Sequence, residues 1–276
     1  MPLSRLRLKR SRPLRSYLAL LAACALAGCG GGVPLLHTAR VLPPGHTAFG
    51  AGLSDRLLLG DEKHALAGVE ARASNAPLPP TNDSRYTRGV LVAVAEGPAV
   101  APWVSTRVGI PGSNEAGLSY TGQALRLDAR HAFEWDQSAL SLGLGLTGRG
   151  FGQSALDLPG TDLDRANGFG VDVPVLFGYH TDAELISVWA GARAEYDRWS
   201  GAVTLGVNPS FALSAQRFAA GPVLGLAVGL SPLWVAAELE LDYAHVTGSL
   251  DRPGTHYDSQ IDGLSVHPAG ALIAKF

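Results

Sequence analysis

After residue 30 the sequence has no uninterrupted apolar run of about 18 residues, the length that a membrane-spanning helix requires. Residues 218–237 come closest, but they contain two prolines. This absence excludes the class of helical membrane proteins. Cysteine is also scarce, because the chain has only Cys24 and Cys29. A fold held together by several disulfides is therefore excluded as well.

Positive charge is concentrated in the first residues and is scarce in the rest of the chain. Residues 1–28 contain six basic and no acidic side chains, and residues 17–26 are a short apolar run. This arrangement is typical of a secretory signal peptide, which is removed from the mature protein. Its removal takes the formal net charge from −2 to −8 and leaves about 248 residues, enough for one barrel or two small domains. A basic surface for nucleic acid is therefore not expected.

Residues 26–29 read Leu-Ala-Gly-Cys and follow the apolar run directly. This tetrapeptide resembles the lipobox of bacterial lipoproteins, a resemblance that implies cleavage before Cys29 and attachment of lipid to that cysteine. Cys24 would then leave with the signal peptide, so the mature chain could form no internal disulfide. Acylation would also remove the reactivity of a single exported thiol. We expect residues 1–28 to be the signal peptide and residues 29–45, rich in glycine and proline, to be a lipidated tether.

In ten stretches after residue 45, apolar residues alternate one for one with small or polar residues. Within residues 138–149 the leucines at 140, 142, 144 and 146 point to one side, and small or charged residues point to the other. A period of two is typical of a strand with two different faces. The strands are predicted at residues 46–57, 86–97, 99–110, 122–134, 138–151, 169–181, 184–198, 217–231, 234–248 and 264–276.

The connections between these strands alternate between short and long, which is typical of bacterial outer-membrane barrels. The sequence therefore predicts an all-β fold, an antiparallel up-and-down transmembrane β-barrel of about ten strands over residues 46–276. Eight or twelve strands are possible if residues 203–213 also pair or if the first hairpin is irregular. The short connections are predicted at residues 98, 135–137, 181–184 and 231–233, and the long loops at residues 58–85, 111–121, 152–168, 199–216 and 249–263.

The last residues, 269–276, alternate in the same way and end in Phe276. This segment resembles the C-terminal strand signal of outer-membrane barrel proteins, which the barrel-assembly machinery reads. The resemblance implies a location in the bacterial outer membrane. An even number of strands then puts both the lipidated N-terminus and Phe276 on the periplasmic side. The expected partners are membrane lipid, the assembly machinery, and a surface ligand or protein bound by the outer loops. We expect no nucleic acid among them.

The inward phase of the strands carries most of the charge. Five arginines and seven carboxylates lie on it, mostly basic on the third to fifth predicted strands and mostly acidic on the seventh and ninth. We expect these two sides to pair across the lumen, because arginine binds carboxylates bidentately. Glycines such as Gly143 and Gly145 are then small lumen residues that leave room for arginine, not a phosphate-binding loop. The predicted network is Arg107, Arg126, Asp128, Arg130, Arg149, Asp172, Arg193, Glu195, Asp197, Glu238, Glu240 and Asp242.

Three functions are compatible with this pattern. The first is a non-enzymatic barrel with a closed lumen, whose long loops at residues 58–85 and 199–216 bind a partner. The second is a narrow charge-lined channel or small-solute transporter. The third is a hydrolase at the rim, since ten-stranded barrels include the omptin-like proteases and Ser265, His267 and Asp242 lie near one another in the predicted register.

No cofactor is expected. No metal site is expected either, because the histidines are scattered without a recognisable ligand spacing.

Overall fold

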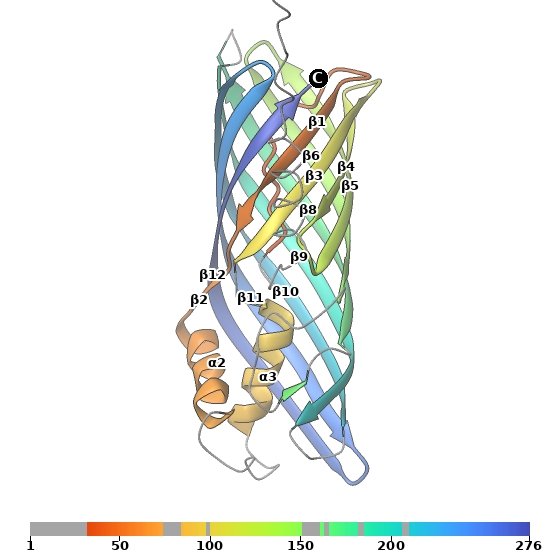
Figure 1. Cartoon of the computed structure of the whole chain (residues 1–276), viewed down its shortest axis with the longest axis vertical. Coiled ribbons are helices and arrows are strands. Elements are labelled where there is room, and N and C mark those ends of the chain that lie inside the picture. The colour runs from red at the N-terminus through yellow and green to blue at the C-terminus, as the bar shows by residue number, and fades with distance from the viewer. Residues whose placement is uncertain are drawn as a thin grey trace, which may run out of the picture.

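The computed structural model of the chain describes residues 32–73, 84–97, 100–150, 161–162, 166–181, 185–205 and 210–276. Ten antiparallel strands form a ring, which closes because β1 pairs with both β3 and β12 (Figure 1). The prediction of an up-and-down barrel of ten strands is confirmed. The ring strands are β1 (Thr47–Ser54), β3 (Ala101–Ile110), β4 (Asn114–Tyr120), β5 (Ala124–Trp135), β6 (Ser138–Arg149), β8 (Asn167–His180), β9 (Ile186–Leu205), β10 (Phe211–Leu230), β11 (Leu233–Arg252) and β12 (Thr255–Lys275).

Four further elements complete the described fold. Strand β2 (Leu57–Leu59) pairs with β12, and β7 (Thr161–Asp162) pairs with β9. Helices α2 (Gly60–Ala73) and α3 (Ser84–Glu96) lie between β2 and β3 in the chain. We call the end of the barrel that holds these helices the helical end. The opposite end, where β12 finishes, is the C-terminal mouth.

The strands have the two faces that their alternation predicts. On β11, Val235, Leu239 and Leu241 are exposed on the outside of the ring, whereas Glu238 and Glu240 are buried inside it. The same division holds along β5 and β10. A shift of one residue would exchange the faces and place carboxylates outside, so the hydrophobic pattern determines the register.

Two errors in the predicted strands cancel in the strand count. Residues 86–97 were predicted as a strand but form most of helix α3. In this segment Val90, Leu91 and Val92 are all fully buried, because the helix is enclosed by strands; a continuous apolar run of this length does not distinguish a helix from a buried strand. Residues 111–121 were predicted as a loop but contain β4, which alternates over only seven residues.

The predicted long loops are mostly regular structure. Residues 58–85 contain α2, and residues 199–216 and 249–263 mainly extend β9 to β12, which reach 20 or 21 residues each. Most of residues 152–168 lie outside the described residues. Of the predicted short connections, residues 135–137 and 231–233 hold tight turns at the C-terminal mouth, and the other two include residues that the structure does not describe.

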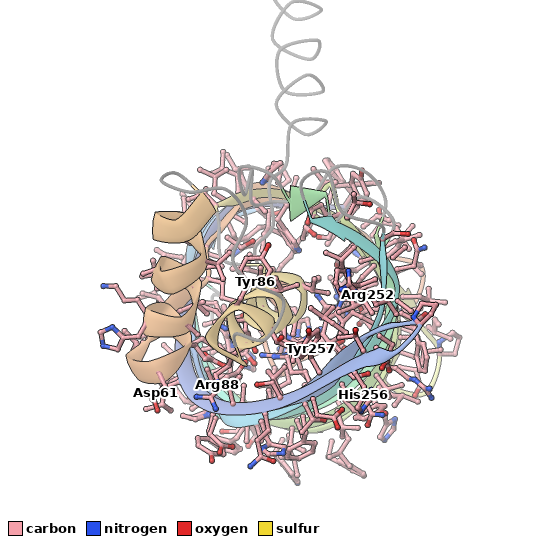
Figure 2. All side chains as sticks on the ribbon, turned by 90° about the horizontal axis from the view of Figure 1, so that it is seen from below. Asp61, Tyr86, Arg88, Arg252, His256 and Tyr257 are labelled. Carbon is pink, nitrogen blue, oxygen red and sulfur yellow. The ribbon has the colours of Figure 1, made fainter. Side chains whose placement is uncertain are left out.

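The long strands enclose α3 at the helical end. Figure 2 shows this helix end-on inside the ring, with α2 against its side and Asp61 directed outward. Val90 and Leu91 of α3 pack against inward-facing Leu213, Val246 and Leu250 of the extended strands. Fully burying such a side chain contributes about 1.5–3 kcal/mol, so this apolar cluster holds the helices as a cap on the lumen. Among the described residues, no helix is long and apolar enough to cross a membrane.

The N-terminal segment lies inside the barrel. We predicted residues 29–45 as a tether, but residues 32–41 are largely buried in the lumen, and we call them the lumen plug. Leu35 and Leu36 are at most 2% exposed and pack in a cluster with Trp103 and Trp189 of the wall. The prediction was wrong for these residues because a short apolar stretch between glycines and prolines has no periodicity that indicates burial. Cys29 lies outside the described residues.

Candidate functional site: the charged lumen

The structure places all twelve predicted network residues inside the ring. Eleven of them are buried, and the side chain of Arg149 is 13% exposed. They occupy the inward positions of β3, β5, β6, β8, β9 and β11. Charges in such a position are costly unless each is paired and hydrogen-bonded, so the contacts of each group decide what the lumen can do.

Near the C-terminal mouth, two arginines share two carboxylates and the plug. Arg130 forms a bidentate pair with Glu115, with Nε–Oε1 and Nη2–Oε2 distances of 3.0 and 2.9 Å. Arg107 donates to both Glu115 and Asp128. Arg130 also donates to the carbonyl oxygens of Thr38 and Arg40 in the plug. The wall and the plug are therefore joined through one guanidinium group.

At mid-height, Arg126 of β5 reaches over β6 to Asp172 of β8 and is fully buried. Its Nε and Nη2 atoms each lie 2.8 Å from Asp172, and its Nη1 atom lies 2.7 Å from Asp128. Gly145 makes this arrangement possible, since a Cβ atom there would lie 2.2 Å from Oδ1 of Asp172. The glycine supplies the space that a bidentate pair needs, as the alternating pattern suggests.

On the other side of the lumen, Arg217 contacts four carboxylates. Its guanidinium lies 2.6 Å from both Glu96 and Glu195, 3.2 Å from Asp197 and 3.5 Å from Asp242. Glu96 belongs to α3, so this arginine joins the cap to the barrel wall. The side chain is 0% exposed, as is that of Arg126, and it contacts more carboxylates than Arg126 does.

Most pairs run around the wall between nearby strands, not across the lumen. Arg149 on β6 pairs with Asp197 on β9 at 3.1 Å, and Arg193 on β9 lies 2.6 Å from Glu195 on the same strand. Our expectation of a basic side facing an acidic side is corrected accordingly. Adjacent strands lie about 4.8 Å apart, so inward side chains on them meet more easily than side chains on opposite walls.

Five charged residues of the network were missed by the sequence reading. Arg217 is the first residue of a predicted strand and follows the inward phase, so the alternation pattern contained its signal. Glu115 also alternates inward, on the strand that we predicted as a loop. Arg56 also follows the inward phase, at the end of the predicted strand 46–57. Glu62 and Glu96 lie on helices whose position in the lumen no periodicity indicates.

The plug is held by the chain's own polar groups. Glu238 accepts hydrogen bonds from the backbone N–H groups of Leu35 and Leu36, at 2.7 and 2.9 Å, and from the indole of Trp189 at 3.1 Å. Leu36 has a φ of 46°, in the left-handed region, where successive N–H groups converge on one anion. Arg193 donates to the carbonyl of Val33 at 2.9 Å.

Glu62 on α2 is a buried carboxyl group without a hydrogen-bond partner. Both of its oxygens are enclosed, and the group lies over Gly263 of β12. Burial, with a further contribution from the charge of Glu96, raises the pKa of Glu62 to about 8. At neutral pH this carboxyl is therefore mostly protonated, which reduces the negative charge beneath the cap.

Ser265, His267 and Asp242 are neighbours but do not form a hydrolytic triad. Ser265 Oγ lies 2.8 Å from Nε2 of His267, and Oδ2 of Asp242 lies 3.7 Å from the same nitrogen. A triad needs the carboxylate on one ring nitrogen and the nucleophile on the other. All three side chains are also buried rather than open to a cleft, so the geometry of a rim hydrolase is not met.

A cavity of about 540 Å³ lies at the C-terminal mouth, between the plug and the wall. It is lined by plug residues such as His37 and by Trp189, Trp234 and Lys275. This space is the part of the lumen that the plug does not fill.

Comparisons with known proteins add no functional argument. No family model and no curated protein matches the chain. Similar solved structures include Ail, the attachment invasion locus protein of Yersinia pestis, at 12% identity over 85% of this chain and 100% of that one, with a TM-score of 0.32. Neisserial surface protein A is 11% identical over 84% of this chain and 99% of that one, with a TM-score of 0.31. Scores at this level are too low to bear on what this chain does.

Proposed function

We propose that the chain is a bacterial outer-membrane barrel. The support is a belt of exposed apolar side chains around the ring. On β11 the belt runs from Leu233 to Tyr243, and on β8 from Phe169 to Tyr179. Ten residues span about 33 Å along a strand, or about 25 Å along the axis at a tilt of about 40°, which matches the apolar height of known membrane barrels.

Its function in this proposal is non-enzymatic, with a closed lumen and a working surface at the helical end. The observation that carries the proposal is the filling of the lumen by three layers: the plug, the paired arginines and the apolar cap. The arginines at mid-height, Arg126 and Arg193, each contact at least two acidic side chains. Loops and extensions on a rigid barrel are suited to binding a partner.

Lipidation of Cys29, which the lipobox implies, is proposed as a second form of the mature chain, because acylation and a seated plug exclude each other. The carbonyl of Gly32 accepts a hydrogen bond from Ser54, which lies seven residues along β1 from the C-terminal mouth. Seven residues of strand correspond to about 18 Å along the axis, whereas the three residues from Cys29 to Gly32 span at most about 11 Å. A chain acylated at Cys29 on that side of the membrane does not seat the plug, and its lumen is then closed by the paired arginines and the cap alone. Mass spectrometry of the mature N-terminus tests the acylation.

Conductance in a planar bilayer separates the closed barrel from the alternative, a narrow charge-lined channel. We expect a silent wild-type protein and open events in an Arg126→Ala, Arg130→Ala variant, because the variant removes a guanidinium group at mid-height and the one that joins the plug to the wall. Arg88→Ala, at an exposed arginine of α3, is the matched control and should stay silent. Steady conductance of the wild type, altered in the double variant, would establish the channel instead.

Labelling of intact cells tests the orientation. Asp61 at the helical end and Asp136 at the C-terminal mouth are both exposed. We expect Asp61→Cys, but not Asp136→Cys, to react with a maleimide that cannot cross the outer membrane. The reverse pattern would refute a working surface at the helical end.

A further inference from the structure

Three potential metal ligands converge inside the lumen although no sequence spacing indicates them. Glu240 and Asp242 alternate inward on β11, and His267 on β12 is the direct cross-strand partner of Glu240. One ligand atom from each side chain lies within 4.8 Å of the others. The three residues are 2%, 1% and 7% exposed. Our expectation that the chain has no metal site rested on linear spacing, which does not record pairing between strands.

The two carboxylates each present an oxygen that nothing satisfies. Oε1 of Glu240 and Oδ1 of Asp242 are buried without a hydrogen-bond partner. Their other oxygens each accept one long hydrogen bond from an arginine, from Arg193 to Glu240 at 3.3 Å and from Arg217 to Asp242 at 3.5 Å. Buried acceptors of this kind are costly, so they point to a missing positive group.

The charge of the whole lumen leads to the same conclusion. Among the described residues, ten buried carboxyl groups face only seven buried or nearly buried guanidinium groups. The carboxyls are Glu62, Glu96, Glu115, Asp128, Asp172, Glu195, Asp197, Glu238, Glu240 and Asp242, and the guanidiniums are those of Arg56, Arg107, Arg126, Arg130, Arg149, Arg193 and Arg217. Two of the three surplus carboxyl groups are accounted for. Glu238 accepts hydrogen bonds from three N–H groups, and Glu62 is mostly protonated at neutral pH because its pKa is about 8. The negative charge that remains uncompensated lies at Glu240 and Asp242.

We propose that Glu240, Asp242 and His267 bind one divalent first-row transition-metal ion, with Ser265 beside the site. A histidine nitrogen with two carboxylate oxygens is a donor set suited to zinc, cobalt or manganese. In a tetrahedral site, metal–ligand bonds of about 2.1 Å place the ligand atoms about 3.4 Å apart. The three donor atoms, which lie within 4.8 Å of one another, therefore need to approach by about 1 Å. The plug closes the site, since a Cβ on Gly32 would lie 2.9 Å from His267.

The test uses the full folded protein, stripped with a chelator, incubated with equimolar Zn²⁺ and desalted. We expect about one zinc per chain by elemental analysis, and an affinity at least about 100-fold lower in His267→Gln and in Asp242→Asn. His256→Gln is the matched control, because His256 is an exposed histidine between Asp251 and Asp258 and should leave the buried zinc in place. Folding of each variant is verified by heat-dependent migration in gels.

A second measurement needs no change in the lumen. Cobalt bound to the His245→Gln, His256→Gln variant should give a visible absorption band of nitrogen and oxygen ligation. This band cannot come from the surface, because the variant lacks both exposed His–Asp pairs. Loss of zinc in His256→Gln but not in His267→Gln would assign the metal to the surface and overturn the proposal. Absence of zinc in the folded wild type together with absence of the cobalt band in the double variant would also overturn it.

Discussion

Replacement of Arg217 by methionine is the most informative perturbation of the lumen. The guanidinium contacts Glu96, Glu195, Asp197 and Asp242, but these four carboxylates do not depend on it equally. Glu96 keeps Arg56 at 3.2 Å, Glu195 keeps Arg193 and Asp197 keeps Arg149. Asp242 keeps only His267, at 3.7 Å. The variant therefore leaves one carboxylate without a guanidinium and weakens the junction of α3 with the wall.

The expected loss follows from the cost of an uncompensated buried charge. Breaking a buried ion pair by removing one partner costs about 3–5 kcal/mol. In protein stripped of metal with a chelator, we expect Arg217→Met to lower the free energy of unfolding by this amount at pH 8. At pH 5 the loss should be smaller, because a carboxyl that has lost its cation takes up a proton more readily and its charge then disappears.

Urea unfolding of the refolded protein in detergent micelles, followed by tryptophan fluorescence, measures both values. Arg88→Met is the matched control, because Arg88 lies on α3, the helix that Arg217 binds through Glu96, but is exposed and makes one weak contact, at 3.5 Å, with Ser259. Its effect should stay below about 0.5 kcal/mol. A loss below about 1 kcal/mol for Arg217→Met, or one that is larger at pH 5 than at pH 8, would refute our account of the network.

Three further predictions concern other parts of the structure. The pKa of Glu62 is about 8 in the folded protein against 4.5 for the free side chain, so the folded state holds an extra proton between these values and stability should fall as the pH rises from about 4.5 to 8. Glu62→Gln should remove this slope in pH-dependent unfolding. Glu238→Gln should accelerate hydrogen exchange of the Leu35 and Leu36 amides at least about tenfold without changing strand amides, and equal rates would contradict the role of Glu238 in holding the plug. Gly145→Val should lower the free energy of unfolding by about 1–3 kcal/mol in the same urea assay, and an unchanged midpoint would show that the lumen has spare room there.

The alternation of residue types was sufficient to predict the barrel and the direction of its side chains. A side chain on β5 or β11 faces lipid or lumen according to whether its position is odd or even, and this rule needs only the local sequence. It identified Arg126, Asp172 and Glu238 as lumen residues. It failed at α3, where a buried apolar run has no period that separates helix from strand, and at β4, which is short.

The identity of each partner depended on the tertiary structure. Arg126 meets Asp172 because β5, β6 and β8 are neighbours in the ring, and His267 meets Glu240 because of the register of β11 with β12. Pairing of this kind joins residues that are far apart in the chain, so no local pattern contains it. The sequence alone determined the class of fold and the two faces of its strands. Only the tertiary structure decided that the plug, the cap and the paired charges fill the lumen, because burial of those segments depends on the space that the closed ring provides.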